Sequence, residues 1–116
     1  MDEKIKKIPA SVRTPVLLKF LQGIRSSGRK IKKIYLFGSR ARGTEKPYSD
    51  YDLLLLVSDS FTLADKDKLY DTVAEILGTS GDVVSLKIFK RKKFDELRRM
   101  KTPFMQHIMR EGVRIG

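Results

Sequence analysis

The chain has no cysteine, no tryptophan and one histidine among its 116 residues. The lack of cysteine excludes a disulfide framework, a thiolate metal site and a cysteine nucleophile. No apolar run approaches the roughly 20 residues that a membrane helix needs, and residues 1–7 are too charged for the apolar part of a signal peptide. We therefore expect a soluble, cytoplasmic protein with no membrane partner.

The length predicts a single domain over residues 1–116, in which residues 1–30 form an N-terminal basic helical segment. Hydrophobic residues make up 41% of the chain and charged residues 34%. Such a chain can bury a modest core but cannot enclose a large substrate in a second lobe. Any bulky acceptor therefore has to come from outside.

The net charge of +11 is unevenly distributed along the chain. Residues 1–33 hold ten Lys and Arg against two Asp and Glu, residues 87–101 hold eight against two, and residues 34–86 hold five against nine. Basic segments can attract nucleotides, nucleic acid or an acidic protein, but they can equally form a solvated helix surface. Composition alone leaves both interpretations open.

The order of helix and strand patterns predicts an α/β (α+β) fold in which helices flank a small mixed β-sheet. Capping residues start helices at Thr14-Pro15, Thr62 and Thr102-Pro103, and glycines are expected to end the last two at Gly78 and Gly112. Further predicted elements are strands at 31–37, 50–57 and 82–89, a helical turn at 39–42 and a basic helix at 91–100. The expected inward-facing residues of the second and last helices are Leu63, Leu69, Val73, Ile76 and Leu77, and Phe104, Met105, Ile108 and Met109.

Gly38 and Ser39 join an apolar strand to a helical turn, where unpaired amides favour an anion. A glycine lets a phosphate approach the backbone, and the serine hydroxyl adds a donor. Arg40 and Arg42 lie beside them and could neutralise phosphate charge. Alone, this pattern more often marks an ordinary turn.

Asp50 and Asp52 open the next strand, whose run from Leu53 to Val57 suits burial on both faces. Residues two apart on a strand share a face, so the two carboxylates should point the same way. Such a like-charged pair favours a cation between its members, and oxygen ligands suit Mg²⁺. The alternative is a pair of surface aspartates that merely begins a strand.

Asp82 opens the third apolar strand and is the third candidate carboxylate. It would join Asp50 and Asp52 if the two strands are neighbours in register, and a third carboxylate allows a second metal ion. The alternative is that Asp82 only punctuates the loop after Gly81.

These motifs resemble the signature of the minimal nucleotidyltransferases of the DNA polymerase β superfamily. The resemblance rests on residues 38–43 (Gly-Ser-Arg-Ala-Arg-Gly) and 49–53 (Ser-Asp-Tyr-Asp-Leu), with Asp82 at the third-carboxylate position and a similar C-terminal segment at 103–113. It implies Mg²⁺-dependent transfer of a nucleoside monophosphate from ATP or another triphosphate to a hydroxyl. Asp50, Asp52 and Asp82 would be catalytic and hold one or two Mg²⁺ ions. Gly38, Ser39, Arg42 and Ser49 would bind the nucleotide.

Small members of this family often occur with an all-helical HEPN partner, and some are antitoxins that nucleotidylate a tyrosine of that partner. The resemblance thus implies a protein partner, although a homo-oligomer is a further possibility. Two other functions stay open: a non-catalytic protein that neutralises a partner by binding it, and a nucleic-acid-binding module.

Overall fold

The computed structural model describes residues 8–43 and 50–116 and contains one four-stranded sheet in the order β3-β2-β1-β4. The strands are β1 (Ile31–Phe37), β2 (Tyr51–Val57), β3 (Val84–Lys90) and β4 (Val113–Arg114). β1 is antiparallel to β2 and β4, whereas β2 and β3 are parallel. The predicted mixed sheet is confirmed, and β4 is a short strand that the sequence pattern missed.

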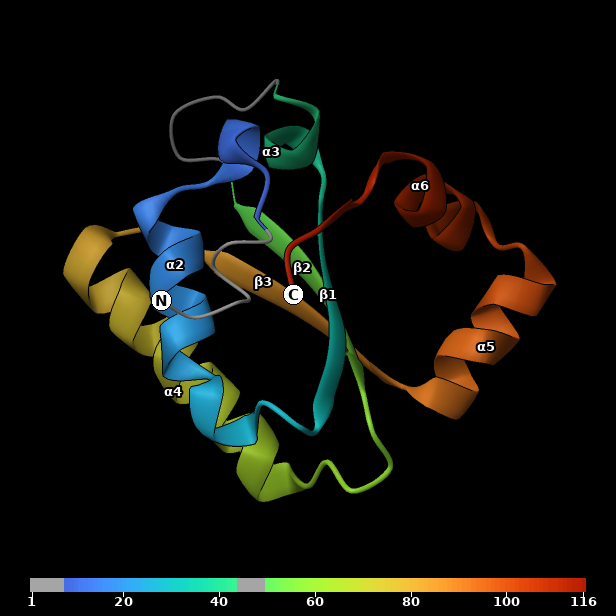
Figure 1. Ribbon diagram of the computed structural model, residues 1–116, viewed down its shortest axis with the longest axis horizontal. Coiled ribbons are helices and arrows are strands. Elements are labelled where there is room, and N and C mark those ends of the chain that lie inside the picture. The colour runs from blue at the N-terminus through green and yellow to red at the C-terminus, as the bar shows by residue number, and fades with distance from the viewer. Residues whose placement is uncertain (1–7, 44–49) are drawn as a thin grey trace.

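Helices cover both faces of this sheet (Figure 1). α2 (Pro15–Gly23) and α4 (Leu63–Ser80) lie on one side, and α5 (Arg91–Met100) and α6 (Pro103–Glu111) lie on the other. The remaining helical pieces are η1 (Ala10–Val12), η2 (Arg25–Ser27) and the four-residue α3 (Ser39–Arg42). Within residues 8–43 and 50–116, no helix is both long enough and apolar enough to cross a membrane.

Side-chain caps explain why three of the helices begin where the sequence predicts. Thr14 accepts a hydrogen bond from the amide of Leu17, and Thr102 accepts one from Met105 at the start of α6. Both helices have proline in the first turn, where its missing N–H removes no helical bond. Thr62 and Asp65 form a capping box at α4.

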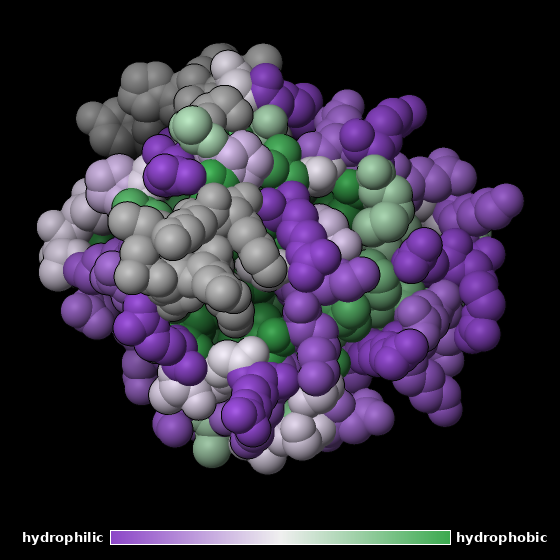
Figure 2. Space-filling model, in the orientation of Figure 1, coloured by the Kyte–Doolittle hydropathy of each residue, from purple (hydrophilic) through white to green (hydrophobic). Residues whose placement is uncertain are grey.

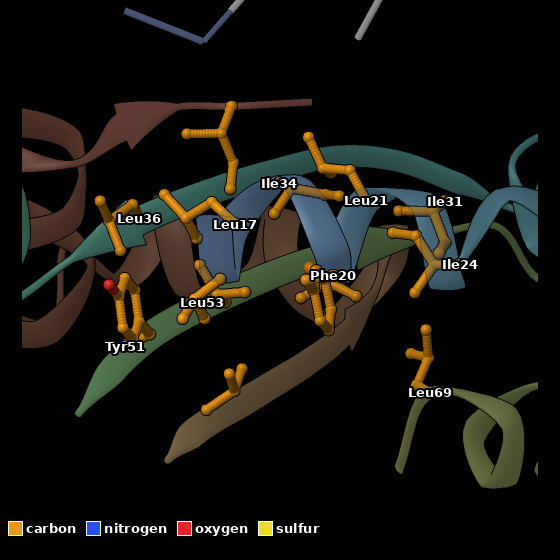
Figure 3. Close-up of a cluster of buried hydrophobic side chains, with 14 of the residues drawn as sticks. Leu17, Phe20, Leu21, Ile24, Ile31, Ile34, Leu36, Tyr51, Leu53 and Leu69 are labelled. Carbon is orange, nitrogen blue, oxygen red and sulfur yellow. The ribbon is translucent and has the colours of Figure 1, made fainter. Parts of the chain in front are cut away.

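β2 is the centre of the fold because its residues from Leu53 to Val57 are buried on both faces. Leu53, Leu55 and Val57 pack in a cluster with α2 and α4, where Figure 3 shows Leu17, Phe20 and Leu21 facing the sheet. Leu54 and Leu56 pack on the opposite face with Phe94, Met105 and Ile108 of α5 and α6. Apolar contacts on two sides therefore fix the strand that carries the aspartates.

Two expectations about α4 are wrong. The helix passes Gly78 and ends at Ser80, and the capping residue Gly81 adopts φ 77° while its amide donates to the carbonyl of Leu77. Leu69 and Ile76 are buried as expected, but Leu63 and Leu77 are 78% and 52% exposed. The reason is the helical period, which turns positions 63 and 77 away from the side that holds 69 and 76.

The apolar face of α6 is also narrower than expected. Met105 and Ile108 are buried, whereas Met109 is 44% exposed. Met109 follows Ile108 by about 100° around the helix, so both cannot point straight at the sheet. Met109 therefore contributes to the surface on the α5 side.

Candidate active site

Gly38 links the end of β1 to the start of α3 and lies directly against Asp52. Its backbone has φ 78° and ψ −161°, a conformation that is essentially restricted to glycine. A Cβ atom at this position would lie 2.5 Å from Oδ2 of Asp52. The structure therefore gives two reasons for the glycine, its backbone conformation and the close carboxylate, in addition to the expected access for a phosphate.

Asp50 and Asp52 occupy the beginning of the buried central strand. Asp50 is exposed immediately before β2, and the half-buried Asp52 pairs with Phe37 of β1. The pKa of Asp52 is raised from 3.8, first because burial disfavours its charge and then because Asp50 lies nearby. Lys87 partly offsets this increase. The two carboxylates thus repel each other as the sequence pattern suggests.

The sequence predicts that Asp82 opens the third strand, but β3 begins only at Val84, so Asp82 lies in the connection before this neighbouring parallel strand. The register pairs Tyr51 with Val84 and Asp52 with Ser85, so Asp82 lies three residues before the level of Asp52. It is at the same edge of the sheet, because parallel neighbours begin at the same edge. Among the residues that the structure describes, no group of three His, Asp or Glu side chains is positioned to hold a metal ion. The role of Asp82 as third ligand stays a prediction.

Ser85 and Lys87 are site neighbours that the sequence reasoning missed. Along β3 both side chains lie on the face of the sheet opposite to that of Val84. The register places Ser85 beside Asp52 and Lys87 beside Leu54. Lys87 is exposed and close enough to lower the pKa of Asp52. Their alternation is visible in the sequence, but only the parallel register shows that they share a face with Asp52.

The arginines beside the glycine turn point to different parts of the molecule. The guanidinium of Arg40 lies 3.9 Å from the ring centre of Tyr51. Arg42 instead reaches α6, where its Nη1 lies 3.4 Å from Oε2 of Glu111 and 3.5 Å from Nε2 of His107. Ser49, predicted to bind nucleotide, lies outside the described residues.

Comparison with known proteins identifies the family of the chain. The model of the family described as "Polymerase beta, Nucleotidyltransferase" matches residues 19–115 and so includes the glycine turn and all three candidate aspartates. The chain belongs to the polymerase beta nucleotidyltransferase family. The predicted family is therefore confirmed, and with it the assignment as a nucleotidyltransferase.

Two relatives of this nucleotidyltransferase carry related descriptions. "Protein adenylyltransferase MntA" of Shewanella oneidensis is 32% identical over 69 residues, which cover 60% of this chain and 50% of that protein. A protein of Methanocaldococcus jannaschii, provisionally named a protein adenylyltransferase, is 31% identical over 86 residues, covering 74% of this chain and 80% of the relative. The chain thus spans half of the first relative and most of the second.

Solved structures confirm the nucleotidyltransferase fold. A crystal structure of a toxin–antitoxin with AMP-PNP has a TM-score of 0.58 and 23% identity, covering 86% of this chain and 72% of that one. A mutant of the toxin–antitoxin MntA-HpeT has a TM-score of 0.56 and 19% identity, with 86% and 71% coverage. A protein of Sulfolobus solfataricus that is provisionally named a nucleotidyltransferase has a TM-score of 0.54 and 19% identity, covering 98% of this chain and 86% of that one.

Proposed function

We propose that this nucleotidyltransferase moves a nucleoside monophosphate, in the first place AMP from ATP, to a hydroxyl group of a partner protein. The observation that carries this proposal is the contact between the glycine turn and Asp52, because it joins the predicted phosphate site to the predicted metal site. The adenylyltransferase names of the relatives support ATP as the donor. A tyrosine hydroxyl of an all-helical HEPN protein is the proposed acceptor.

The donor set at the start of β2 fits Mg²⁺. Asp50 and Asp52 supply carboxylate oxygens, which Mg²⁺ prefers, and their mutual repulsion is the charge imbalance that a cation relieves. Asp82 is the proposed third ligand at the same sheet edge and would allow a second ion. When bound, Mg²⁺ neutralises triphosphate charge and favours attack at the α-phosphorus.

The residues around this site divide the remaining tasks. Gly38 leaves space for the triphosphate beside the backbone, the Ser39 and Ser49 hydroxyls donate to phosphate oxygens, and Arg42 offsets negative charge. The acceptor oxygen forms a bond to the α-phosphorus while the bond from that phosphorus to the bridging oxygen of pyrophosphate breaks. Asp82 accepts or positions the hydroxyl proton, and pyrophosphate leaves with the bridging electron pair.

A transfer assay with labelled ATP tests the proposal. Wild-type protein, Mg²⁺ and the co-purified partner should give a labelled partner and a mass increase of one nucleotide. The pair of changes Asp50→Asn and Asp52→Asn should lower the rate by about a hundredfold or more, because both proposed metal ligands lose their charge. Asp95→Asn, which removes an exposed carboxylate of α5, is the matched control. Undiminished labelling by the double variant would refute the proposed site.

A second candidate function is neutralisation of a partner by binding alone, and the surface of α5 and α6 favours it. A groove there is lined by Arg98, Lys101, Met105, Gln106, Met109 and Arg110, with three cations and no carboxylate. Hydrophilic residues dominate this side of the molecule, with a few hydrophobic residues among them (Figure 2). Basic residues around exposed methionine suit an acidic amphipathic segment.

Binding and turnover can be separated with the same variants. If the protein acts by binding alone, the double asparagine variant should still inhibit its partner, whereas Met109→Glu should weaken the complex. Partner capture that is lost with the aspartates in a folded protein would contradict this candidate. The groove of α5 and α6 could instead bind a second copy of this chain or RNA. RNA binding would weaken steeply as the salt concentration rises.

A further inference from the structure

Arg42, His107 and Glu111 form a polar cluster that connects α3 to α6. Oε2 of Glu111 lies 3.4 Å from Nη1 of Arg42 and 3.2 Å from Nε2 of His107. The three side chains are 42%, 36% and 32% exposed, in the order Arg42, His107, Glu111. One carboxylate oxygen is therefore shared by a guanidinium and an imidazole from two separate segments of the chain.

The two sides of this cluster differ in how firmly the fold holds them. Arg42 ends a helix of only four residues, which follows directly on Gly38. α6 is held by buried Met105 and Ile108, and its Phe104 contacts Phe37 edge to face at 5.7 Å. The chain then continues from α6 into β4, which pairs with β1. Glu111 therefore belongs to the more firmly packed side of the cluster.

The contact leaves most of the guanidinium available. Within the described part of the chain, Arg42 contacts both Glu111 and His107 through Nη1. Its Nε and Nη2 groups keep their donors for another acceptor. A long arginine side chain has many rotamers, so holding one end of the guanidinium reduces the freedom that phosphate binding would otherwise remove.

We propose that Glu111 is a positioning residue that orients Arg42 toward the triphosphate. This inference rests on the proposed nucleotidyl transfer and assigns the ion pair a part in nucleotide binding. For the removal of Glu111, positioning predicts weaker triphosphate binding, whereas charge repulsion alone predicts tighter binding. A carboxylate near a triphosphate repels it, so removal of Glu111 should tighten binding if the residue only contributes charge.

Calorimetric titration of the protein with ATP in the presence of Mg²⁺ distinguishes positioning of Arg42 from simple repulsion by Glu111. Glu111→Ala should weaken binding about three- to fivefold, which is the range expected when an exposed ion pair no longer orders a side chain. KM for ATP should rise by the same factor while kcat changes less than twofold. Glu111→Gln, which keeps an oxygen acceptor, should recover most of the affinity. Arg42→Ala should weaken binding about tenfold or more.

A double-mutant cycle shows whether Glu111 acts through Arg42. In the Arg42→Ala background, Glu111→Ala should change the affinity less than 1.5-fold, because there is no guanidinium left to orient. Asp95→Ala, which removes the carboxylate of the exposed Arg91 pair on α5, is the control and should not change ATP affinity.

The outcomes separate this inference from the proposed function. If wild-type protein binds and transfers the nucleotide but Glu111→Ala binds ATP equally well or more tightly, the positioning role is overturned and the proposed function stands. An equal loss in the Arg42→Ala background also overturns it, because Glu111 then acts without Arg42. If wild-type protein neither binds ATP nor labels any acceptor, both proposals fail. Circular dichroism of each variant keeps a folding defect from being read as weak binding.

Discussion

Replacing Gly38 by alanine is the sharpest test of how the fold supports the site. The added Cβ would lie 2.5 Å from Oδ2 of Asp52, closer than nonbonded atoms approach. The backbone at φ 78° and ψ −161° is also one that alanine strongly disfavours. Asp52 sits on a strand buried on both faces, so the carboxylate has to rotate while the strand stays in place.

Two separate effects should follow from Gly38→Ala. The backbone strain should lower the free energy of unfolding by about 1–3 kcal/mol. For a domain of this size, that corresponds to a fall in Tm of roughly 4–12 °C. The rotation of Asp52 should reduce nucleotidyl transfer about a hundredfold or more, because a misplacement of about 1 Å in a reacting site has effects of that order.

Gly43→Ala is the matched control. Gly43 also has a positive φ of 73°, but a Cβ there would meet nothing within 4 Å. It should therefore lose about 1–2 kcal/mol of stability through backbone strain alone. Thermal unfolding with and without Mg²⁺ separates the two variants. Mg²⁺ at about 100 times its Kd should stabilise wild type and Gly43→Ala by about 2.7 kcal/mol and Gly38→Ala much less.

The reasoning would be refuted by a Gly38→Ala protein that keeps both the Mg²⁺-dependent rise in Tm and the transfer rate. Such a result would mean that Asp52 can move without consequence, or that it is not part of the site. Equal loss of activity in both glycine variants would mean that loop strain, rather than the contact with Asp52, controls the site.

Three further predictions concern stability. Asp52→Asn should raise the Tm of metal-free protein at neutral pH. Because burial, and then Asp50, raise the pKa of Asp52, the native state binds more protons than the unfolded state and stability falls as pH rises through that pKa. An unchanged or lower Tm would contradict the raised pKa of Asp52. Hydrogen bonds from Lys30 and from the amide and hydroxyl of Thr62 lower the pKa of Asp65 from 3.8 to about 2. The stabilisation by this carboxylate should therefore disappear as pH falls through that interval, and Asp65→Asn should flatten the Tm profile there. Leu54→Ala should lower the unfolding free energy by about 2–5 kcal/mol in denaturant titrations, since Leu54 is fully buried beneath α5 and α6; a loss below 1 kcal/mol would contradict that packing.

Elements governed by local chemistry could be predicted from the sequence. Ile31 to Phe37 forms a strand over the expected residues, and α5 has the expected bounds. The caps at Thr14 and Thr102 act within one helical turn, so neighbouring residues contain the whole signal. These predictions succeed because each depends on residues at most four positions apart.

The errors arise where three-dimensional neighbours decide the outcome. Gly78 looks like a helix end, but Thr79 and Ser80 donate from their hydroxyls to carbonyls one turn back and the helix continues to Ser80. Leu77 has the composition of a core residue and still faces outward. A glycine can lie within a helix or end it, and a leucine can lie in the core or at the surface. The packing of α4 against the sheet decides between these possibilities.

The site shows the same division between local and distant information. Gly38, Asp50 and Asp52 follow from the sequence because a turn and a two-residue alternation are local patterns. The approach of Gly38 to Asp52 depends on antiparallel pairing of β1 with β2, and the nearness of Lys87 depends on the parallel register of β3. The link from Arg42 to Glu111 joins positions 69 residues apart, and no pattern in the sequence pairs them.

The arrangement of β2 explains why an unfavourable charge pair can persist at this position. Asp52 is destabilised by its surroundings and by Asp50, and Gly38 holds a backbone conformation that other residues avoid. The same strand buries every residue from Leu53 to Val57 against helices on both faces. A local penalty of a few kcal/mol at the strand end can therefore be offset by the apolar contacts that follow it. Because those contacts also prevent the strand from shifting, a cation relieves the repulsion better than backbone movement does, and metal binding should stabilise this fold.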